Sequence, residues 1–231
     1  MTMWIETGRR PCASPWPAGT VYGALLNYRA DLEALGPRMQ AAPYNAPPRA
    51  PILYIKPRNT WIGDADPIPL PPGANALQVG ATLGLVLGRP CIRATEETVL
   101  DSVAALTVVN DACLPHDDVF RPAIKERCRD GFCPIGLPIS RRVDAAALDG
   151  MVMLTYIDGA VRAEWKMADL VRSAARLLAD VSEFMTLHAG DVLLIGSPRS
   201  APLATPGQCV AVEVTGIGRL ENPVVAAGDA R

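Results

Sequence analysis

Short apolar runs separated by turn residues extend along most of the chain. The 22 prolines and 19 glycines among 231 residues divide the sequence into short pieces, which favours strands joined by turns over a helical bundle. The predicted strands lie within residues 20–27, 51–63, 81–88, 190–196 and 208–218. We therefore expect a β-rich α+β fold in which helices cover an otherwise all-β core.

The clearest local signal is a β-hairpin at residues 152–165. Two apolar runs flank the pair Asp158-Gly159, and these two residue types accept the positive φ angles of a type I′ turn. We expect the chain to reverse direction at this pair.

Helical spacing of apolar residues is strongest within residues 167–187. The residues that share this spacing are Leu170, Ala174, Leu177, Leu178 and Val181. A shorter helix is expected at 29–36. Residues 95–111 are expected to open as a helix capped by Thr95 and to continue as a strand.

Composition places the chain among globular proteins with a sizeable core. Hydrophobic residues make up 49% and charged residues 20% of the sequence, and we expect an irregular N-terminal arm at 1–18 followed by one domain at 19–231. The net charge of −2, with scattered basic residues, argues against nucleic acid as a partner. No apolar run reaches the roughly 18 residues of a membrane span, and the N-terminus lacks a signal-like apolar core, so a cytoplasmic location is expected.

Six cysteines are present, and we expect all of them to be free thiols. Cys128 and Cys133 are too far apart for a CxxC redox pair, and no second pair completes a zinc site. Packing is the expected role of these two side chains.

Several motifs occur in one order along most of the chain. They are "YGALLNYRADLEALG", "PILYIKPRNTWIGDADPIPLPP", "GLVLGR", "VVNDACLP", "DGFCPIGLPI", "SEFMTLHAGDVLLIGSP" and "GIGRLENPVV". In order and spacing the chain resembles the fumarylacetoacetate hydrolase family from about residue 20 to 225. The resemblance implies a mixed β-roll with covering helices, and a catalytic domain over 19–231.

The segment "CLP" after the Asn-Asp pair, together with "FRPAIKERCRDGFCPIG", narrows the resemblance. These stretches look most like the N-terminal half, or separate first subunit, of the family's isomerase/decarboxylases of 4-hydroxyphenylacetate degradation. That branch implies a small 2-oxo di- or tricarboxylate substrate. The implied reactions are decarboxylation of 5-carboxymethyl-2-oxo-hex-3-ene-1,6-dioate and isomerisation of 2-hydroxyhepta-2,4-diene-1,7-dioate.

Two alternatives to this enzyme stay open. In the first, the chain is a non-catalytic subunit that assembles with a metal-bearing homologue. In the second, it is an acylpyruvate-type C–C hydrolase. A homo-oligomer, or a hetero-oligomer with a homologous second subunit, is the implied assembly.

The resemblance also implies a Mg²⁺ or Mn²⁺ ion, held in typical members by a Glu-x-Glu pair and the Asp of Asn-Asp. Hard cations prefer carboxylate oxygens, and positions i and i+2 face one side of a strand. Here Gly80 and Thr82 occupy the two glutamate positions, and Asp111 alone matches the third ligand. We expect an incomplete site that binds metal weakly, and we expect glutamates at both positions to create affinity if the backbone matches.

Four residues are candidate catalytic groups: His116, Asp111, Lys125 and Arg127. His116 suits proton transfer because an imidazole can act as an acid or as a base, but an exposed loop residue is an equally good interpretation. Arg127 replaces a family lysine and can clamp a carboxylate without shuttling protons, so Lys125 could substitute for that lysine. Asp31 takes the position of a family histidine, as a base or a solvated acid.

Four further residues are candidate substrate-binding groups: Lys56, Arg58, Arg121 and Ser197. Lys56 matches the lysine of the family's "FLKP", and Arg58 is expected on the same strand face. Ser197 lies in "IGSP", which corresponds to a pocket-lining family loop. It is not expected to be a hydrolase nucleophile, because no GxSxG motif surrounds it.

Overall fold

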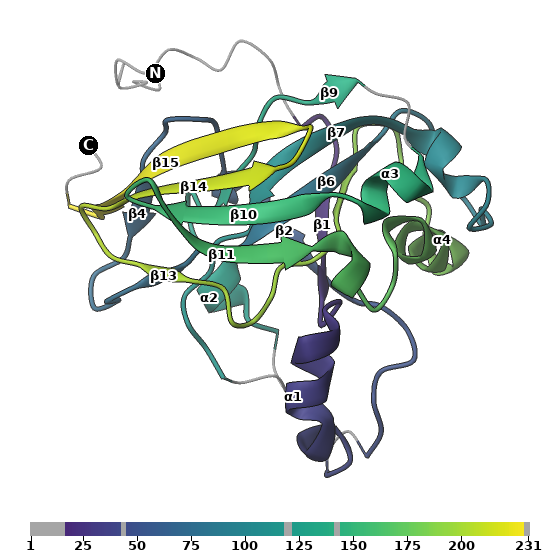
Figure 1. Cartoon of the computed structure of the whole chain (residues 1–231), viewed down its shortest axis with the longest axis horizontal. Coiled ribbons are helices and arrows are strands. Elements are labelled where there is room, and N and C mark those ends of the chain that lie inside the picture. Colours follow the sequence, from purple (N-terminus) through teal and green to yellow (C-terminus); the bar gives the residue numbers. More distant parts are fainter. Residues whose placement is uncertain (1–16, 43–44, 118–121, 141–143, 229–231) are drawn as a thin grey trace, which may run out of the picture.

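Two β-sheets lie face to face around the main core of the protein (Figure 1). The structure is a computed structural model that describes residues 17–42, 45–117, 122–140 and 144–228. The first sheet has the strand order β2-β1-β12-β6-β7-β9. Its strands are β1 (Val21–Leu25), β2 (Ile52–Lys56), β6 (Ala81–Leu87), β7 (Val103–Asn110), β9 (Ile139–Ser140) and β12 (Val192–Leu194).

The second sheet has the order β11-β10-β14-β15-β4. Its strands are β4 (Ile68–Leu70), β10 (Val152–Ile157), β11 (Ala160–Lys166), β14 (Cys209–Val214) and β15 (Gly218–Ala226). Two short pairs complete the strands: β3 (Trp61–Ile62) with β8 (Cys133–Pro134), and β5 (Leu77–Gln78) with β13 (Leu203–Ala204). The β-rich α+β fold predicted from the sequence is confirmed.

The strand β6 is buried along its whole length because both of its faces are covered. Leu83, Leu85 and Leu87 point into the main core, as the two-residue period of a strand requires. On the opposite face, Val86 joins a second apolar cluster. The other buried members of this cluster are Val21, Ala105, Val109, Cys133, Ile135, Val192 and Leu194.

The hairpin expected at residues 152–165 is present as β10 and β11. Asp158 and Gly159 have φ angles of 51° and 77°, so both adopt the left-handed conformation that the turn needs. This prediction is confirmed.

The helices are α1 (Arg29–Met39), α2 (Ile124–Arg127), α3 (Ala145–Asp149) and α4 (Ala174–Phe184), with 3₁₀ turns η1 (Arg58–Thr60), η2 (Val99–Ser102) and η3 (Met167–Asp169). The helix expected over 167–187 is shorter, because Ser173 caps α4 by accepting a hydrogen bond from the Arg176 N–H. The helical opening expected after Thr95 is the 3₁₀ turn η2.

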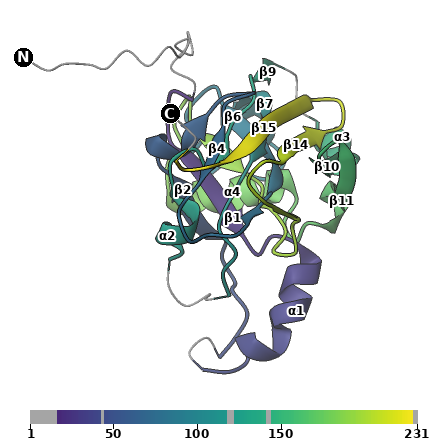
Figure 2. The same ribbon diagram turned by 90° about the vertical axis from the view of Figure 1, so that its left-hand side faces the viewer.

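The helix α1 stands away from the sheets in both views (Figures 1 and 2). Its buried residues are Asp31, Leu35 and Met39. Within the ranges described above, no helix is both long and apolar enough to cross a lipid bilayer.

The five cysteines in the described ranges are free. The expectation of free thiols is confirmed for these five, and Cys12 lies outside the described residues, as does most of the predicted arm at 1–18.

Candidate active site

A buried carboxylate, that of Asp111, is the centre of the most highly charged part of the interior. It follows β7 and is 1% exposed. Its Oδ1 lies 2.9 Å from Lys56 Nζ, and its Oδ2 lies 3.0 Å from Arg127 Nη1. Oδ2 also accepts hydrogen bonds from the hydroxyls of Ser197, at 3.0 Å, and Tyr54. We call these five residues the Asp111 cluster.

Lys56 is enclosed by the protein on every side. It ends β2 with 0% exposure, and its ammonium donates to the carbonyls of Ala112 (2.7 Å), Arg127 (2.9 Å) and Phe132 (3.0 Å). An ammonium has three donors, and all three are used by backbone. The prediction that Lys56 binds substrate directly is therefore wrong, and its contacts make it a positioning residue.

Arg127 is held on two sides. Its guanidinium forms the ion pair with Asp111 and lies over the Tyr54 ring, 4.7 Å from the centroid. Burial disfavours the charged form, but the Asp111 carboxylate raises the pKa of Arg127 above its ordinary value. This arginine is charged and has a fixed orientation.

Neighbouring charges also influence the protonation states of Asp111 and Tyr54. Burial raises the pKa of Asp111, but the charges of Lys56 and Arg127 lower it more, to about 2. Burial and the neighbouring Asp111 raise the pKa of Tyr54 well above its ordinary value. At neutral pH the cluster therefore contains two cations, one carboxylate and a neutral phenol.

A cleft of about 490 Å³ opens beside the cluster, and Arg127 belongs to both. The cleft lies between the loop that follows β7, with His116, and the segment before β13, with Arg199. His116 is half-buried, and its Nδ1 lies 2.9 Å from the Leu114 carbonyl. Because a carbonyl only accepts, Nδ1 carries the proton in this contact, and Nε2 remains able to accept one.

Arg199 is fixed through its backbone by the helix α1. Its N–H lies 3.2 Å from Oδ1 and 3.0 Å from Oδ2 of Asp31. Asp31 is only 6% exposed, and burial raises the pKa of its carboxyl. The interpretation of Asp31 as a solvated acid is therefore wrong, because its carboxylate anchors the segment that lines the cleft.

The structure brings some of the predicted site residues together and separates others. Asp111, Arg127 and Ser197 are in contact, and His116 lies in the adjoining cleft. Arg58 does not share a strand face with Lys56, because β2 ends at Lys56 and Arg58 opens η1 as an exposed residue.

Two further predicted residues do not join the site. Lys125 is exposed on α2 and does not line the cleft, so it is poorly placed to replace a catalytic lysine. Arg121 lies outside the described residues.

Sequence reasoning missed Tyr54 and Arg199. Tyr54 had a usable signal, because it precedes Lys56 by two positions and side chains at i and i+2 share a strand face. Arg199 comes two residues after Ser197 in a loop, and a loop has no regular periodicity from which the direction of a side chain could be predicted.

The residues present do not fit a divalent metal ion. A Cβ on Gly80 would overlap the Asp111 carbonyl oxygen, so that position cannot carry a glutamate in this backbone. Thr82 is buried, and its hydroxyl donates to the Gly196 carbonyl at 2.8 Å. In the described part of the chain, no group of three or more His, Cys, Asp or Glu side chains could hold a metal ion. Two glutamates are expected to create affinity only if the backbone matches that of the family, and the backbone at Gly80 does not meet this condition.

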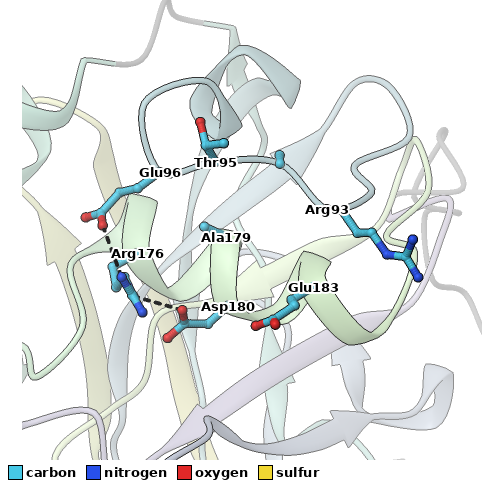
Figure 3. Close-up of a pocket in the computed structure, with 8 residues that line it drawn as sticks. Arg93, Thr95, Glu96, Arg176, Ala179, Asp180 and Glu183 are labelled. Atoms are coloured by element: carbon cyan, nitrogen blue, oxygen red, sulfur yellow. Dashed lines mark ion pairs between the residues drawn. The ribbon is translucent and has the colours of Figure 1, made fainter.

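A second depression lies between residues 93–96 and α4 (Figure 3). Its charges are largely satisfied among themselves, since Arg176 pairs with Glu96 at 3.7 Å and with Asp180 at 2.8 Å. It contains no residue of the Asp111 cluster. The cleft beside Arg127 is therefore the better candidate site.

Comparison with known proteins decides the family. The model of the fumarylacetoacetate (FAA) hydrolase C-terminal domain matches residues 20–225. The chain belongs to the fumarylacetoacetate hydrolase family. This fumarylacetoacetate hydrolase family protein is 42% identical over 207 residues to a 4-hydroxyphenylacetate degradation bifunctional isomerase/decarboxylase of Escherichia coli. That match covers 90% of this chain and 47% of the relative, so the chain spans about half the length of the curated relatives it matches.

Two solved structures resemble the chain in fold. The chain resembles 5-carboxymethyl-2-hydroxymuconate delta-isomerase from Mycobacterium smegmatis with a TM-score of 0.75 and 29% identity, over 92% of this chain and 80% of that one. It resembles 2-hydroxyhepta-2,4-diene-1,7-dioate isomerase from Mycobacterium marinum with a TM-score of 0.76 and 27% identity, over 93% and 77%.

Proposed function

We propose that the chain is a subunit of an isomerase/decarboxylase that acts on small 2-oxo di- or tricarboxylates, as in 4-hydroxyphenylacetate degradation. The relatives named above support this branch of the family. The observation that carries the proposal is the cleft, in which a buried, oriented arginine lies with a half-buried histidine.

Of the two reactions, isomerisation of 2-hydroxyhepta-2,4-diene-1,7-dioate fits these residues better. The enol O–H loses a proton and a carbon of the conjugated chain gains one, so a single group that accepts and returns a proton is sufficient. His116 has that capacity at Nε2, and Arg127 can hold a carboxylate through charged N–H donors. Decarboxylation needs a stronger electron sink for the charge left by CO₂, and the Asp111 cluster has no metal ligand set to supply it.

A second candidate function is a non-catalytic subunit that completes an oligomer with a metal-bearing homologue. The observation that favours it is the absence of carboxylates at Gly80 and Thr82, the positions at which typical family members carry the glutamate ligands. An acylpyruvate-type hydrolase ranks last, because that chemistry uses a metal-activated water, and the donor set does not fit the metal.

The test is to assay both steps with the purified chain, in excess EDTA and again with added Mg²⁺. We expect isomerisation in EDTA, reduced about 10²- to 10⁴-fold by His116→Gln, the usual size of a general acid/base contribution. The matched control is His188→Gln, because His188 is the second of the two histidines and is exposed. No activity alone, with activity restored by a homologous partner that carries the metal ligands, would favour the non-catalytic subunit.

A further inference from the structure

The Asp111 cluster contains one more positive than negative charge. Lys56 and Arg127 are both buried, and they share the single carboxylate of Asp111. Within the described ranges, no other carboxylate lies within ion-pair distance of either cation. A buried charge without a partner is costly, so an anion in the adjoining cleft would complete the balance.

Arg127 is built to receive that anion. Asp111 occupies Nη1, and the Tyr54 ring lies against the guanidinium plane. Its Nε is buried and has no hydrogen-bond partner among the residues that the structure describes, although a guanidinium has five N–H donors to satisfy. The side chain lines the cleft, so a carboxylate there would meet a guanidinium whose orientation is already fixed by Asp111 and Tyr54.

Arg199 supplies a second cation to the same cleft. Its backbone is fixed by Asp31, and its side chain forms no ion pair within the part of the chain that the structure describes. The exposed Asp117 lines the cleft as well, so the lining carries two arginines against one carboxylate. Two arginines in one cleft suit a ligand with a negative charge at each end.

We infer that this cleft binds dicarboxylates without a divalent cation, with Arg127 as the fixed receptor for one carboxylate and Arg199 as the contact for the other. The positive charge that a metal ion would bring to a 2-oxo acid comes instead from the chain itself. The choice of a dicarboxylate rests on the proposed function, whereas the binding step requires no turnover.

The experiment is calorimetric titration of the whole chain with heptanedioate, an unreactive seven-carbon dicarboxylate, in excess EDTA and again with Mg²⁺. We expect the same affinity in both buffers and weaker binding of hexanoate, which has one carboxylate. Arg127→Gln should weaken heptanedioate binding about tenfold or more, because a charge-assisted pair is lost. The matched control is Arg89→Gln, since Arg89 is an exposed arginine that does not line the cleft, and this variant should bind heptanedioate as tightly as the parent.

A further variant keeps the inference falsifiable if Arg127→Gln does not fold. Arg199→Gln should weaken heptanedioate binding and leave hexanoate binding unchanged, because only the two-ended ligand uses both arginines. Binding that requires Mg²⁺, or that neither arginine variant weakens, overturns the inference. Metal-independent binding of heptanedioate without turnover of the substrates supports the inference and contradicts the proposed function. Turnover without metal-independent binding supports the proposed function and contradicts the inference.

Discussion

At the scale of single residues, one aspartate balances two buried cations. Replacing Asp111 with Asn leaves Lys56 and Arg127 uncompensated in the interior. We expect Asp111→Asn to lower the free energy of unfolding by about 3–5 kcal/mol, the usual cost of breaking a buried ion pair. Urea denaturation measures this change. Asp149→Asn, at an exposed position, should stay within about 0.5 kcal/mol of the parent.

The same aspartate gives a pH dependence with a definite sign. Its pKa in the folded protein is about 2, against 3.8 for an ordinary aspartate. A lowered pKa stabilises the folded state above about pH 4, and this stabilisation disappears as the pH falls toward 2. The difference in free energy of unfolding between the parent and Asp111→Asn should therefore narrow over that range. A difference that stays constant from pH 5 to pH 2 would contradict the ion-pair interpretation.

The site residues found from the sequence were those that family motifs mark by position. Asp111, Arg127 and Ser197 lie together because their motifs come from elements that meet in this fold. The enclosure of Lys56 could not be predicted, since its three acceptors come from segments 56, 71 and 76 residues away. Contacts between such distant segments leave no local pattern.

At the scale of elements, local sequence patterns predicted whether a segment is a helix or a strand better than they predicted the length of that element. The Asp158-Gly159 turn fixed the hairpin because both residues accept positive φ angles. The apolar period placed α4 correctly but extended it too far, because periodicity does not distinguish a helix from the 3₁₀ turn η3 that precedes it. The strand assignment at Arg58 failed for a similar reason, since η1 begins where β2 ends.

The Asp31 carboxylate couples the helix α1 to the cleft. Asp31→Ala removes both oxygens that face the Arg199 N–H. We expect faster amide hydrogen exchange across residues 197–203 in this variant, because the segment loses its anchor. Glu33→Ala is the matched control, since Glu33 is exposed on the same helix. Equal exchange in the two variants would show that α1 does not restrain the cleft.

At the scale of the whole molecule, the main core is shared by both sheets. Buried residues of β6 and β7 pack with those of β10, β14 and β15 in one cluster. The single domain at 19–231 stays a prediction, and we expect urea unfolding followed by tryptophan fluorescence and by far-ultraviolet circular dichroism to give one coincident transition. Two separated midpoints would show that the sheets unfold independently.

The close approach at Gly80 limits how this chain could acquire a metal centre. The Gly80 N–H donates to the Asn110 side chain, and the Asp111 N–H donates to the Gly80 carbonyl. These bonds hold the Asp111 carbonyl where a Cβ at position 80 would lie. Any side chain introduced at position 80 would therefore clash with the Asp111 carbonyl and could not place an oxygen to coordinate a cation. A side chain at position 80 therefore cannot become a ligand unless the end of the β6–β7 ladder moves, so a metal centre here requires a backbone change as well as a new oxygen donor.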